Sequence, residues 1–161
     1  MQSDGMNGFS TSELALGHGL LGLCPLPVTQ ADRAALVQWR PDLVLTLTET
    51  AEMADLGAAG LPDLLAAHAI DWLHLPIVDY DIPAGSAPWG QVAGHVHRIL
   101  GQGGRVMVHC RGGCGRTGMI ALRLMVEQGE EAATALTRLR TARPCAVETD
   151  QQYLWAAGPT T

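Results

Sequence analysis

The sequence predicts an α/β fold with a mostly parallel sheet, and three observations support this. Short apolar runs alternate along the chain with amphipathic stretches, an order typical of parallel α/β sheets. Apolar residues make up 47% of the 161 residues, which suits one packed core. No repeat or interior linker divides the chain, so we expect a disordered tail over residues 1–13 and a single domain over residues 14–161.

In the first half of the chain, strands and helices are expected in alternation. Thr29 and Asp32 have the spacing of a helix N-terminus, and Pro41 stops that helix. Pro76 has no N–H to donate, so the strand that contains it must end there or lie at a sheet edge. The expected elements are one or two short strands within 14–27, a strand over 43–47, helices over 50–56 and 61–69, and a strand over 72–77.

The second half begins with a long loop over 78–89, which is stiffened by prolines and of a length that is often functional. Thr149 and Gln152 form a capping box for the last helix, and Gly129 ends the most apolar one. The remaining expected elements are a strand over 105–108 and helices over 92–100, 119–126, 132–139 and 149–155.

Composition excludes several classes of function. A net charge of −6 gives no broad basic field, so we expect no nucleic-acid partner. No apolar run reaches the roughly 20 residues of a spanning helix, and the N-terminus lacks the basic residues of a signal peptide, so we expect no membrane partner. Four irregularly spaced cysteines are interpreted as reduced thiols of a cytoplasmic protein. We also expect the protein to be a monomer.

The chain contains no lysine, so all ten basic residues are arginines. Schiff-base chemistry and a phosphate-binding loop with a lysine are therefore excluded. Any site for an anion must be built from arginine side chains and backbone amides.

One segment, His109-Cys110-Arg111-Gly112-Gly113-Cys114-Gly115-Arg116-Thr117-Gly118, carries the chemistry. It lies between a predicted buried strand and a predicted buried helix, so successive N–H groups and the helix N-terminus point at one spot. The glycines allow the backbone to curl around an oxyanion without Cβ clashes. The segment 111–116 is thus predicted to be a phosphate-binding loop.

Within this loop the residue types suit phosphoryl transfer. The amides and the helix dipole favour the thiolate form of Cys110, which is the nucleophilic form. The guanidinium of Arg116 can bind two phosphate oxygens at once. Thr117 can donate a hydrogen bond to the departing sulfur, and His109 is expected to order the loop rather than act as a base.

Two simpler interpretations were weighed for the same residues. An isolated cysteine is usually a packed core residue, and a glycine-rich turn is usually only a turn. A nucleotide-binding loop would need glycine in place of Cys110 and lysine in place of Arg116. The combination of cysteine, glycines, arginine and threonine in this order favours the catalytic interpretation.

The stretch 109–117 matches His-Cys-x5-Arg-Ser/Thr, the signature of cysteine-dependent protein tyrosine phosphatases. The chain resembles the small atypical dual-specificity phosphatases of the kinase-associated phosphatase type over about residues 14–157. Three further segments share in the likeness: Gly22-Leu23-Cys24-Pro25-Leu26-Pro27, Leu75-Pro76-Ile77-Val78-Asp79 and Val147-Glu148-Thr149-Asp150-Gln151-Gln152-Tyr153. The resemblance implies a three-layer α/β/α domain that hydrolyses phosphomonoesters through a phosphocysteine intermediate.

The leaving group needs a proton, which members of this family take from an aspartate on a separate loop. Asp79 and Asp81 are both candidates. The family pattern Pro-Ile-x-Asp favours Asp79. Ordinary capping of the loop remains the alternative for both.

Other residues near the loop leave choices open. Cys114 either fills space or traps oxidised Cys110 as a disulfide. Tyr80, Trp89 and Arg111 are candidates for substrate contact. Gln151 and Gln152 are candidates for positioning water, although capping suits Gln152 better. His95 and His97 lack further ligands, and we expect neither a metal nor a cofactor.

The expected function is therefore that of a tyrosine or dual-specificity protein phosphatase. Its partner would be a protein phosphorylated on tyrosine, or on serine or threonine, or another phosphomonoester. Two alternatives remain: a rhodanese-like sulfurtransferase, which also uses a cysteine in an anion-binding loop, and a phosphopeptide-binding domain without catalysis. The Arg116–Thr117 pair and Asp79 favour the phosphatase.

Overall fold

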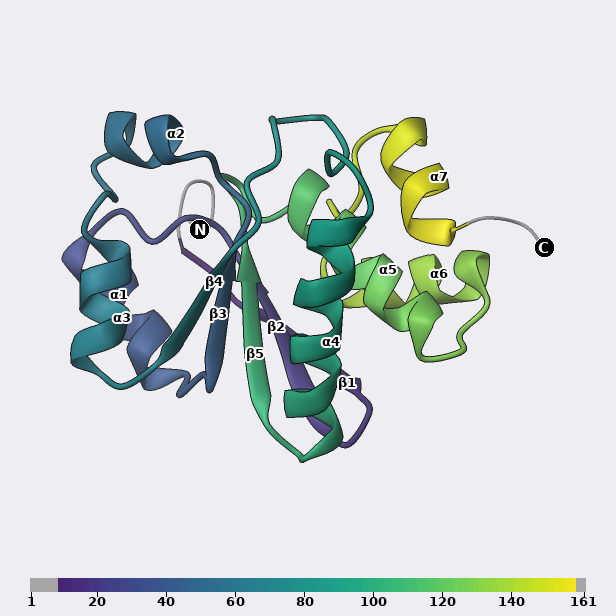
Figure 1. The fold of residues 1–161 in the computed structure, drawn as a ribbon, viewed down its shortest axis with the longest axis horizontal. Helices are drawn as coiled ribbons and strands as arrows, with labels where there is room; N and C mark the ends of the chain where they lie inside the picture. The colour runs from purple at the N-terminus through teal and green to yellow at the C-terminus, as the bar shows by residue number, and fades with distance from the viewer. Residues whose placement is uncertain (1–8, 159–161) are drawn as a thin grey trace.

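The computed structural model describes residues 9–158, which form a five-stranded sheet covered by helices on both faces (Figure 1). The strands are β1 (Ser12–Leu16), β2 (Gly19–Cys24), β3 (Leu43–Thr46), β4 (Asp71–His74) and β5 (Arg105–His109). The helices are α1 (Gln30–Gln38), α2 (Thr50–Asp55), α3 (Leu61–Ala67), α4 (Ala87–Gly101), α5 (Gly115–Glu127), α6 (Ala132–Ala142) and α7 (Asp150–Ala157).

The sheet has the order β1-β2-β5-β3-β4 and is mostly parallel, as predicted. Only β1 runs antiparallel, joined to β2 by a tight turn in which Gly17 has a φ of 61°. Strands β2, β5, β3 and β4 are parallel to their neighbours. Their carboxyl ends therefore meet at one edge of the sheet, where ligands of open α/β folds bind.

The strands bury side chains on both faces, because helices cover both. In β5, Val106 and Val108 face a core shared with α4 and α5, whereas Met107 faces the core beneath α1 and α3. Figure 1 shows α1–α3 on one side of the sheet and α4–α7 on the other. The three-layer α/β/α prediction is confirmed.

Helix starts follow the local sequence code. The Thr29 hydroxyl accepts a bond from the Asp32 N–H at 3.0 Å, and the Asp32 carboxylate accepts one from the Thr29 N–H at 3.2 Å. The same reciprocal capping joins Thr149 and Gln152 at the start of α7. Both capping boxes were predicted from the sequence.

The structure differs from the sequence prediction at several boundaries, and three of these differences concern the prolines and the N-terminal tail. Strand β4 ends at His74, at the edge of the sheet. The N–H groups of Leu75 and Ile77 still donate to the carbonyl oxygens of Thr46 and Leu47, so Pro76 between them faces away from β3 and needs no N–H. The long loop ends before Ala87, because Pro88 occupies the first turn of α4, where a missing N–H costs nothing. Strand β1 begins at Ser12, inside the tail predicted over 1–13, of which residues 1–8 lie outside the described residues. Within 9–158, no helix is long and apolar enough to cross a bilayer.

Candidate active site

The loop between β5 and α5 lies at the carboxyl edge of the sheet, with Cys110 at the bottom of a cavity of about 250 Å³. Cys110 is a free thiol and is 2% exposed. Gly113 has a φ of 74°, and a Cβ there would lie 2.6 Å from the backbone carbon of Cys24, so only glycine fits this turn. The cavity is lined by Asp79, Tyr80, Cys110, Arg111, Gly112, Cys114, Gly115 and Glu148.

His109 is fully buried and holds the start of the loop through both ring nitrogens. Its Nδ1 lies 3.2 Å from the Cys110 carbonyl oxygen, and its Nε2 lies 2.7 Å from the hydroxyl of Thr46. The indole N–H of Trp72 donates to the same hydroxyl at 2.8 Å. A neutral ring that donates from Nδ1 and accepts at Nε2 satisfies this chain. Burial lowers the pKa of His109 to about 4, so the ring is neutral at pH 7.

Arg116, in the first turn of α5, is 1% exposed and held in place by Glu52 of α2. Its Nη1 donates to Glu52 Oε1 at 2.8 Å and its Nη2 donates to Oε2 at 2.6 Å, the two-bond geometry of a strong charged pair. Nη1 also donates to the Ile77 carbonyl at 2.8 Å. The hydrogen bond from Arg116 lowers the pKa of Glu52. Sequence reasoning missed Glu52, since nothing local marks it.

Two buried polar atoms of α5 have no hydrogen-bond partner within the described residues: Nε of Arg116 and the hydroxyl of Thr117. Unpaired buried groups are costly in a native protein unless a ligand satisfies them. Arg116 belongs to the predicted phosphate-binding loop, where an oxyanion would provide an acceptor for its Nε, and Thr117 was predicted to donate to the sulfur of Cys110. Glu52 accepts hydrogen bonds from Nη1 and Nη2 of Arg116, so Nε is the nitrogen left without a partner.

The two candidate acids lie in different surroundings. Asp79 is half-exposed, lines the Cys110 cavity, and has Oδ1 3.3 Å from Nη2 of Arg116. Asp81 is exposed, and its Oδ1 accepts the N–H of Ile82 at 2.8 Å, which is a local loop bond. Asp79 also accepts a local bond, from the N–H of Tyr80 at 3.0 Å. The cavity therefore contains Asp79 and does not contain Asp81.

Of the residues proposed to touch substrate, Tyr80 and Arg111 line the cavity, whereas Trp89 does not. Trp89 lies on α4, is 6% exposed, packs against Trp155, and donates its indole N–H to Glu127 at 2.9 Å. Trp89 stands at the end of the loop predicted over 78–89 and was a candidate for substrate contact. The helix that starts at Ala87 turns it into the core instead.

The cysteines differ from the prediction. Cys114 forms a disulfide with Cys145, with 5.1 Å between their Cα atoms, so the expectation of four reduced thiols is wrong for these two. Cys24 and Cys110 are free, as expected, and burial raises the pKa of the Cys24 thiol. Neither of the two roles weighed for Cys114, filling the loop or trapping Cys110, is the one that the structure gives it.

The segment 143–148, between α6 and α7, packs against the loop that carries Cys110. Arg143 donates to the carbonyl oxygens of Gly113 at 2.6 Å and Gly112 at 3.3 Å. The N–H of Val147 donates to the Cys114 carbonyl at 3.2 Å. The Cys114–Cys145 bond joins the same two segments. The predicted phosphate-binding loop is thus anchored by residues that follow it by about thirty positions.

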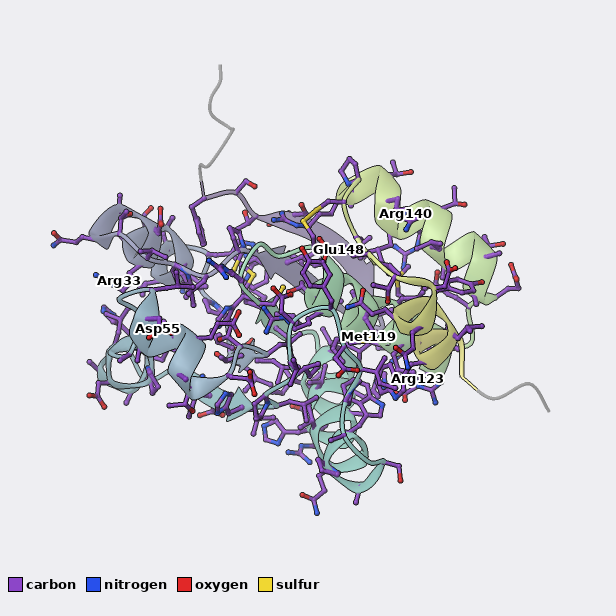
Figure 2. The ribbon with its side chains drawn as sticks, turned by 90° about the horizontal axis from the view of Figure 1, so that it is seen from above. Arg33, Asp55, Met119, Arg123, Arg140 and Glu148 are labelled. Atoms are coloured by element: carbon purple, nitrogen blue, oxygen red, sulfur yellow. A yellow bond between two sulfur atoms is a disulfide. The ribbon has the colours of Figure 1, made fainter. Side chains whose placement is uncertain are left out.

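Glu148, at the end of this segment, places a carboxylate beside the loop, as Figure 2 shows near the centre of the view. A Cβ added to Gly115 would collide with this carboxylate, so a larger residue there would displace the Glu148 side chain. Burial and then the neighbouring Asp79 raise the pKa of Glu148, while Arg116 opposes them. Gln152, a candidate for positioning water, instead accepts the N–H groups of Glu148 and Thr149 as a helix cap. Sequence reasoning missed Glu148 as a cavity residue.

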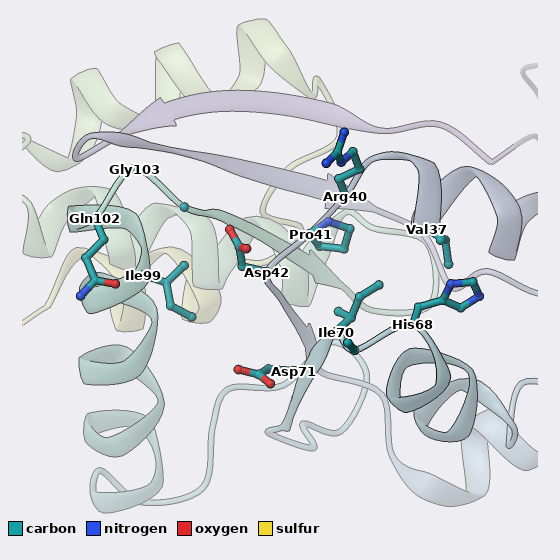
Figure 3. Close-up of a pocket in the computed structure, with 12 residues that line it drawn as sticks. Val37, Arg40, Pro41, Asp42, His68, Ile70, Asp71, Ile99, Gln102 and Gly103 are labelled. Carbon is teal, nitrogen blue, oxygen red and sulfur yellow. The ribbon is translucent and has the colours of Figure 1, made fainter.

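A larger cavity, of about 740 Å³, lies at the opposite end of the sheet, by the amino ends of β3 and β4 (Figure 3). Its charged lining includes Arg40, Asp42 and Asp71. Asp42 is occupied there, because it accepts the N–H of Arg105 at 2.8 Å. None of the residues predicted to be functional lies in it, so its size does not make it the active site.

A family model described as PTP-SAK, Swiss Army Knife protein, DSP-PTPase phosphatase domain, matches residues 16–154. Kinase associated phosphatase with its catalytic cysteine replaced by serine is similar at a TM-score of 0.84 and 23% identity, over 94% of this chain and 93% of that chain. Tk-PTP in its active form is similar at a TM-score of 0.66 and 28% identity, over 82% of this chain and 85% of that chain. PTPMT1 in complex with PI(5)P is similar at a TM-score of 0.74 and 17% identity, over 90% of this chain and 92% of that chain. No curated protein sequence matches this chain.

Proposed function

Because this chain belongs to the PTP-SAK family and is a DSP-PTPase phosphatase domain, we propose that it hydrolyses phosphomonoesters through a phosphocysteine intermediate on Cys110. The observation that carries this proposal is the position of Cys110. Cys110 lines the same cavity as the loop residues Arg111 and Gly112 and as Asp79, and it lies close in sequence to the N-terminus of α5.

In the first step the thiolate of Cys110 attacks phosphorus and the bond from phosphorus to the ester oxygen breaks. Asp79, which enters this step protonated, gives its proton to the leaving oxygen. Arg116 and the loop amides of 111–116 bind the equatorial oxygens, whose charge rises in the transition state. Glu52 fixes the guanidinium plane beforehand, so little reorganisation is needed during the reaction.

In the second step water attacks phosphorus, Asp79 takes the proton from that water, and the sulfur–phosphorus bond breaks. Inorganic phosphate leaves and the Cys110 thiolate is restored. The buried Thr117 hydroxyl, which has no partner within the described residues, is available to donate a hydrogen bond to the departing sulfur. His109 positions the Cys110 carbonyl and transfers no proton, because its ring is buried and neutral.

For the substrate we propose a phosphorylated protein, with phosphotyrosine, phosphoserine and phosphothreonine all considered. The cavity of about 250 Å³ is small and accommodates little beyond the phosphorylated side chain. Sulfur transfer is less favoured, because it gives no role to an aspartate beside Arg116. A binding domain without catalysis is less favoured because Cys110 and Asp79 face the same cavity. We keep a monomer as the working state.

A cytoplasmic location was expected because four cysteines were interpreted as reduced. The Cys114–Cys145 disulfide removes two of them from that argument, since disulfides persist mainly in oxidising compartments. The free thiols of Cys24 and Cys110 are what still supports the cytoplasm, which we keep as the proposed location.

The test is hydrolysis of a generic aryl phosphate in EDTA by wild type, Cys110→Ser and Cys24→Ser. Cys24 is a matched control, a second buried free thiol that does not line the cavity. Turnover by wild type and Cys24→Ser, with none by Cys110→Ser, is expected. Activity in Cys110→Ser would refute the intermediate. If reduced wild type is inactive, thiosulfate–cyanide transfer and phosphopeptide binding are measured next.

A further inference from the structure

The opening of the Cys110 cavity has more acidic than basic side chains. Three charged side chains line it: the carboxylates of Asp79 and Glu148 and the guanidinium of Arg111. All three residues are exposed. A phosphoryl group bound at Cys110 therefore has two acidic side chains and one basic side chain next to it at the surface.

The arginines nearby are already committed to other groups. Arg116 is buried against Glu52. Arg143 gives its donors to Gly112, Gly113 and the side chain of Ser12, behind the loop. Arg140 donates to the carbonyl oxygens of Ala146 and Val147. Among residues 9–158, Arg111 is the one basic side chain that lines the cavity.

This distribution disfavours a second anionic group on the substrate. Like charges brought together at a binding surface weaken association, and opposite charges strengthen it. A second phosphate, or an acidic side chain next to the phosphorylated residue, would approach the carboxylate of Glu148. An arginine or lysine side chain in the same place would be attracted. Glu148 and Asp79 are close enough to interact, because Asp79 contributes to the raised pKa of Glu148.

The surface beside the cavity suits a polypeptide. Val78 and Tyr80 are 54% and 61% exposed, although both are large apolar side chains. The N–H of Asp81 donates to the Val78 carbonyl at 2.9 Å, and this turn holds Tyr80 at a φ of 66°. The aromatic ring thus stands on a tight turn at the cavity, where it can contact an arginine or lysine side chain of a bound segment.

We propose that the substrate is a protein segment with a basic side chain next to its phosphorylated residue, and that Glu148 is the residue that selects it. The proposal rests on the phosphatase function proposed above and narrows its substrate class. Ligands with several phosphates, such as phosphoinositide headgroups, are disfavoured by the same carboxylates.

The test measures binding rather than turnover. Two phosphotyrosine peptides, identical except for arginine or glutamate on either side of the phosphotyrosine, are titrated against the full chain carrying Cys110→Ser. The titrations are repeated with Glu148→Gln added, and with Asp150→Asn added as the control. Asp150 lies two residues from Glu148 and outside the cavity lining, so both additions change the charge equally. Phosphatidylcholine vesicles with and without phosphatidylinositol bisphosphate provide the polyanionic ligand.

The arginine peptide is expected to bind about tenfold more tightly than the glutamate peptide, and Glu148→Gln is expected to reduce this to about threefold. Asp150→Asn should keep the tenfold difference. The proposal would be overturned if the two peptides bound equally, or if the bisphosphate vesicles bound more tightly than the arginine peptide. It would also be overturned if Glu148→Gln and Asp150→Asn changed the preference for the arginine peptide equally. Aryl phosphate turnover by wild type separates the two ideas: turnover without a flanking preference refutes this one alone, and a preference without turnover refutes catalysis alone.

Discussion

The guanidinium of Arg116 is bound by the carboxylate of Glu52 through two hydrogen bonds, of 2.8 and 2.6 Å, although the residues are 64 positions apart. Arg116 is almost fully buried, so its charge needs a partner at all times. Helix α2 contributes that partner from one side of the sheet, and α5 contributes the arginine from the other. The proposed phosphate site therefore combines residues from both sides of the sheet at its carboxyl edge.

We expect Glu52→Gln to lower kcat/KM for an aryl phosphate by about 100-fold, because small displacements of a positioning group cost this much. The free energy of unfolding should fall by about 3 kcal/mol, since a buried charge loses its partner. Both are measured by steady-state kinetics and urea unfolding. Asp55→Asn, at the exposed end of the same helix, is the control and should change neither. Unchanged kinetics in Glu52→Gln would mean that Arg116 does not need Glu52 for its orientation.

The buried His109 should make the protein less stable as the pH falls. Its folded pKa of about 4 lies below the unfolded value of about 6.5, so the unfolded chain binds the extra proton between these values. Stability is full above pH 6.5 and falls as the pH drops toward 4, by on the order of 3 kcal/mol. Urea unfolding at a series of pH values measures this loss. His109→Asn should be less stable at pH 7 but should lose less on acidification.

His68→Asn serves as the control for this measurement, because His68 is exposed. Its stability should follow the same pH dependence as the wild type. A wild-type curve that is flat between pH 6.5 and 4 would contradict the assignment of a buried, neutral His109. So would a His109→Asn curve as steep as that of the wild type.

The sequence predicted the features that are determined by residues close together in the chain. The capping pairs Thr29–Asp32 and Thr149–Gln152 lie three residues apart, and both are made. The buried runs of β3 and β5 and the glycine-rich loop could be predicted for the same reason, since each is specified by consecutive residues. The predicted catalytic residues Cys110, Arg116 and Thr117 come from one such segment.

The rest depends on contacts between distant parts of the chain. Nothing near Glu52 or Glu148 marks either as part of the site; the packing of α2 and of the 143–148 segment brings them there. The partner of Cys114 lies 31 residues away and could not be chosen among three other cysteines from spacing alone. Trp89 was misplaced because the start of α4 depends on how Pro88 fits its first turn.

The contrast between Asp79 and Asp81 gives a prediction about leaving groups. Asp79→Asn should lower kcat by roughly 10²–10⁴, most strongly for aryl phosphates with poor leaving groups, because these need the proton most. Asp81→Asn should do much less, since its carboxylate bonds its own loop. A plot of rate against leaving-group pKa for both variants measures this. A larger loss in Asp81→Asn than in Asp79→Asn would reverse the assignment.

The Cys114–Cys145 disulfide should stabilise the fold without taking part in catalysis. Closing a loop of about 30 residues restricts the unfolded chain, so Cys145→Ser should lower the free energy of unfolding by about 3 kcal/mol. Aryl phosphate turnover at a temperature well below the melting point should be retained, since Cys110 is free. Thiol titration of the denatured, unreduced chain should find two free thiols, those of Cys24 and Cys110, and reduction should release two more.

The same disulfide determines how Cys110 responds to oxidation. Because Cys114 is already bonded to Cys145, it cannot resolve an oxidised Cys110, and peroxide should inactivate wild type and Cys114→Ser at similar rates. Reducing agent should restore both to similar extents. Recovery that is lost only in Cys114→Ser would show that Cys114 exchanges partners and protects Cys110 after all. Four free thiols before reduction would instead show that the 143–148 segment is held to the loop by Arg143 and the Val147 N–H alone.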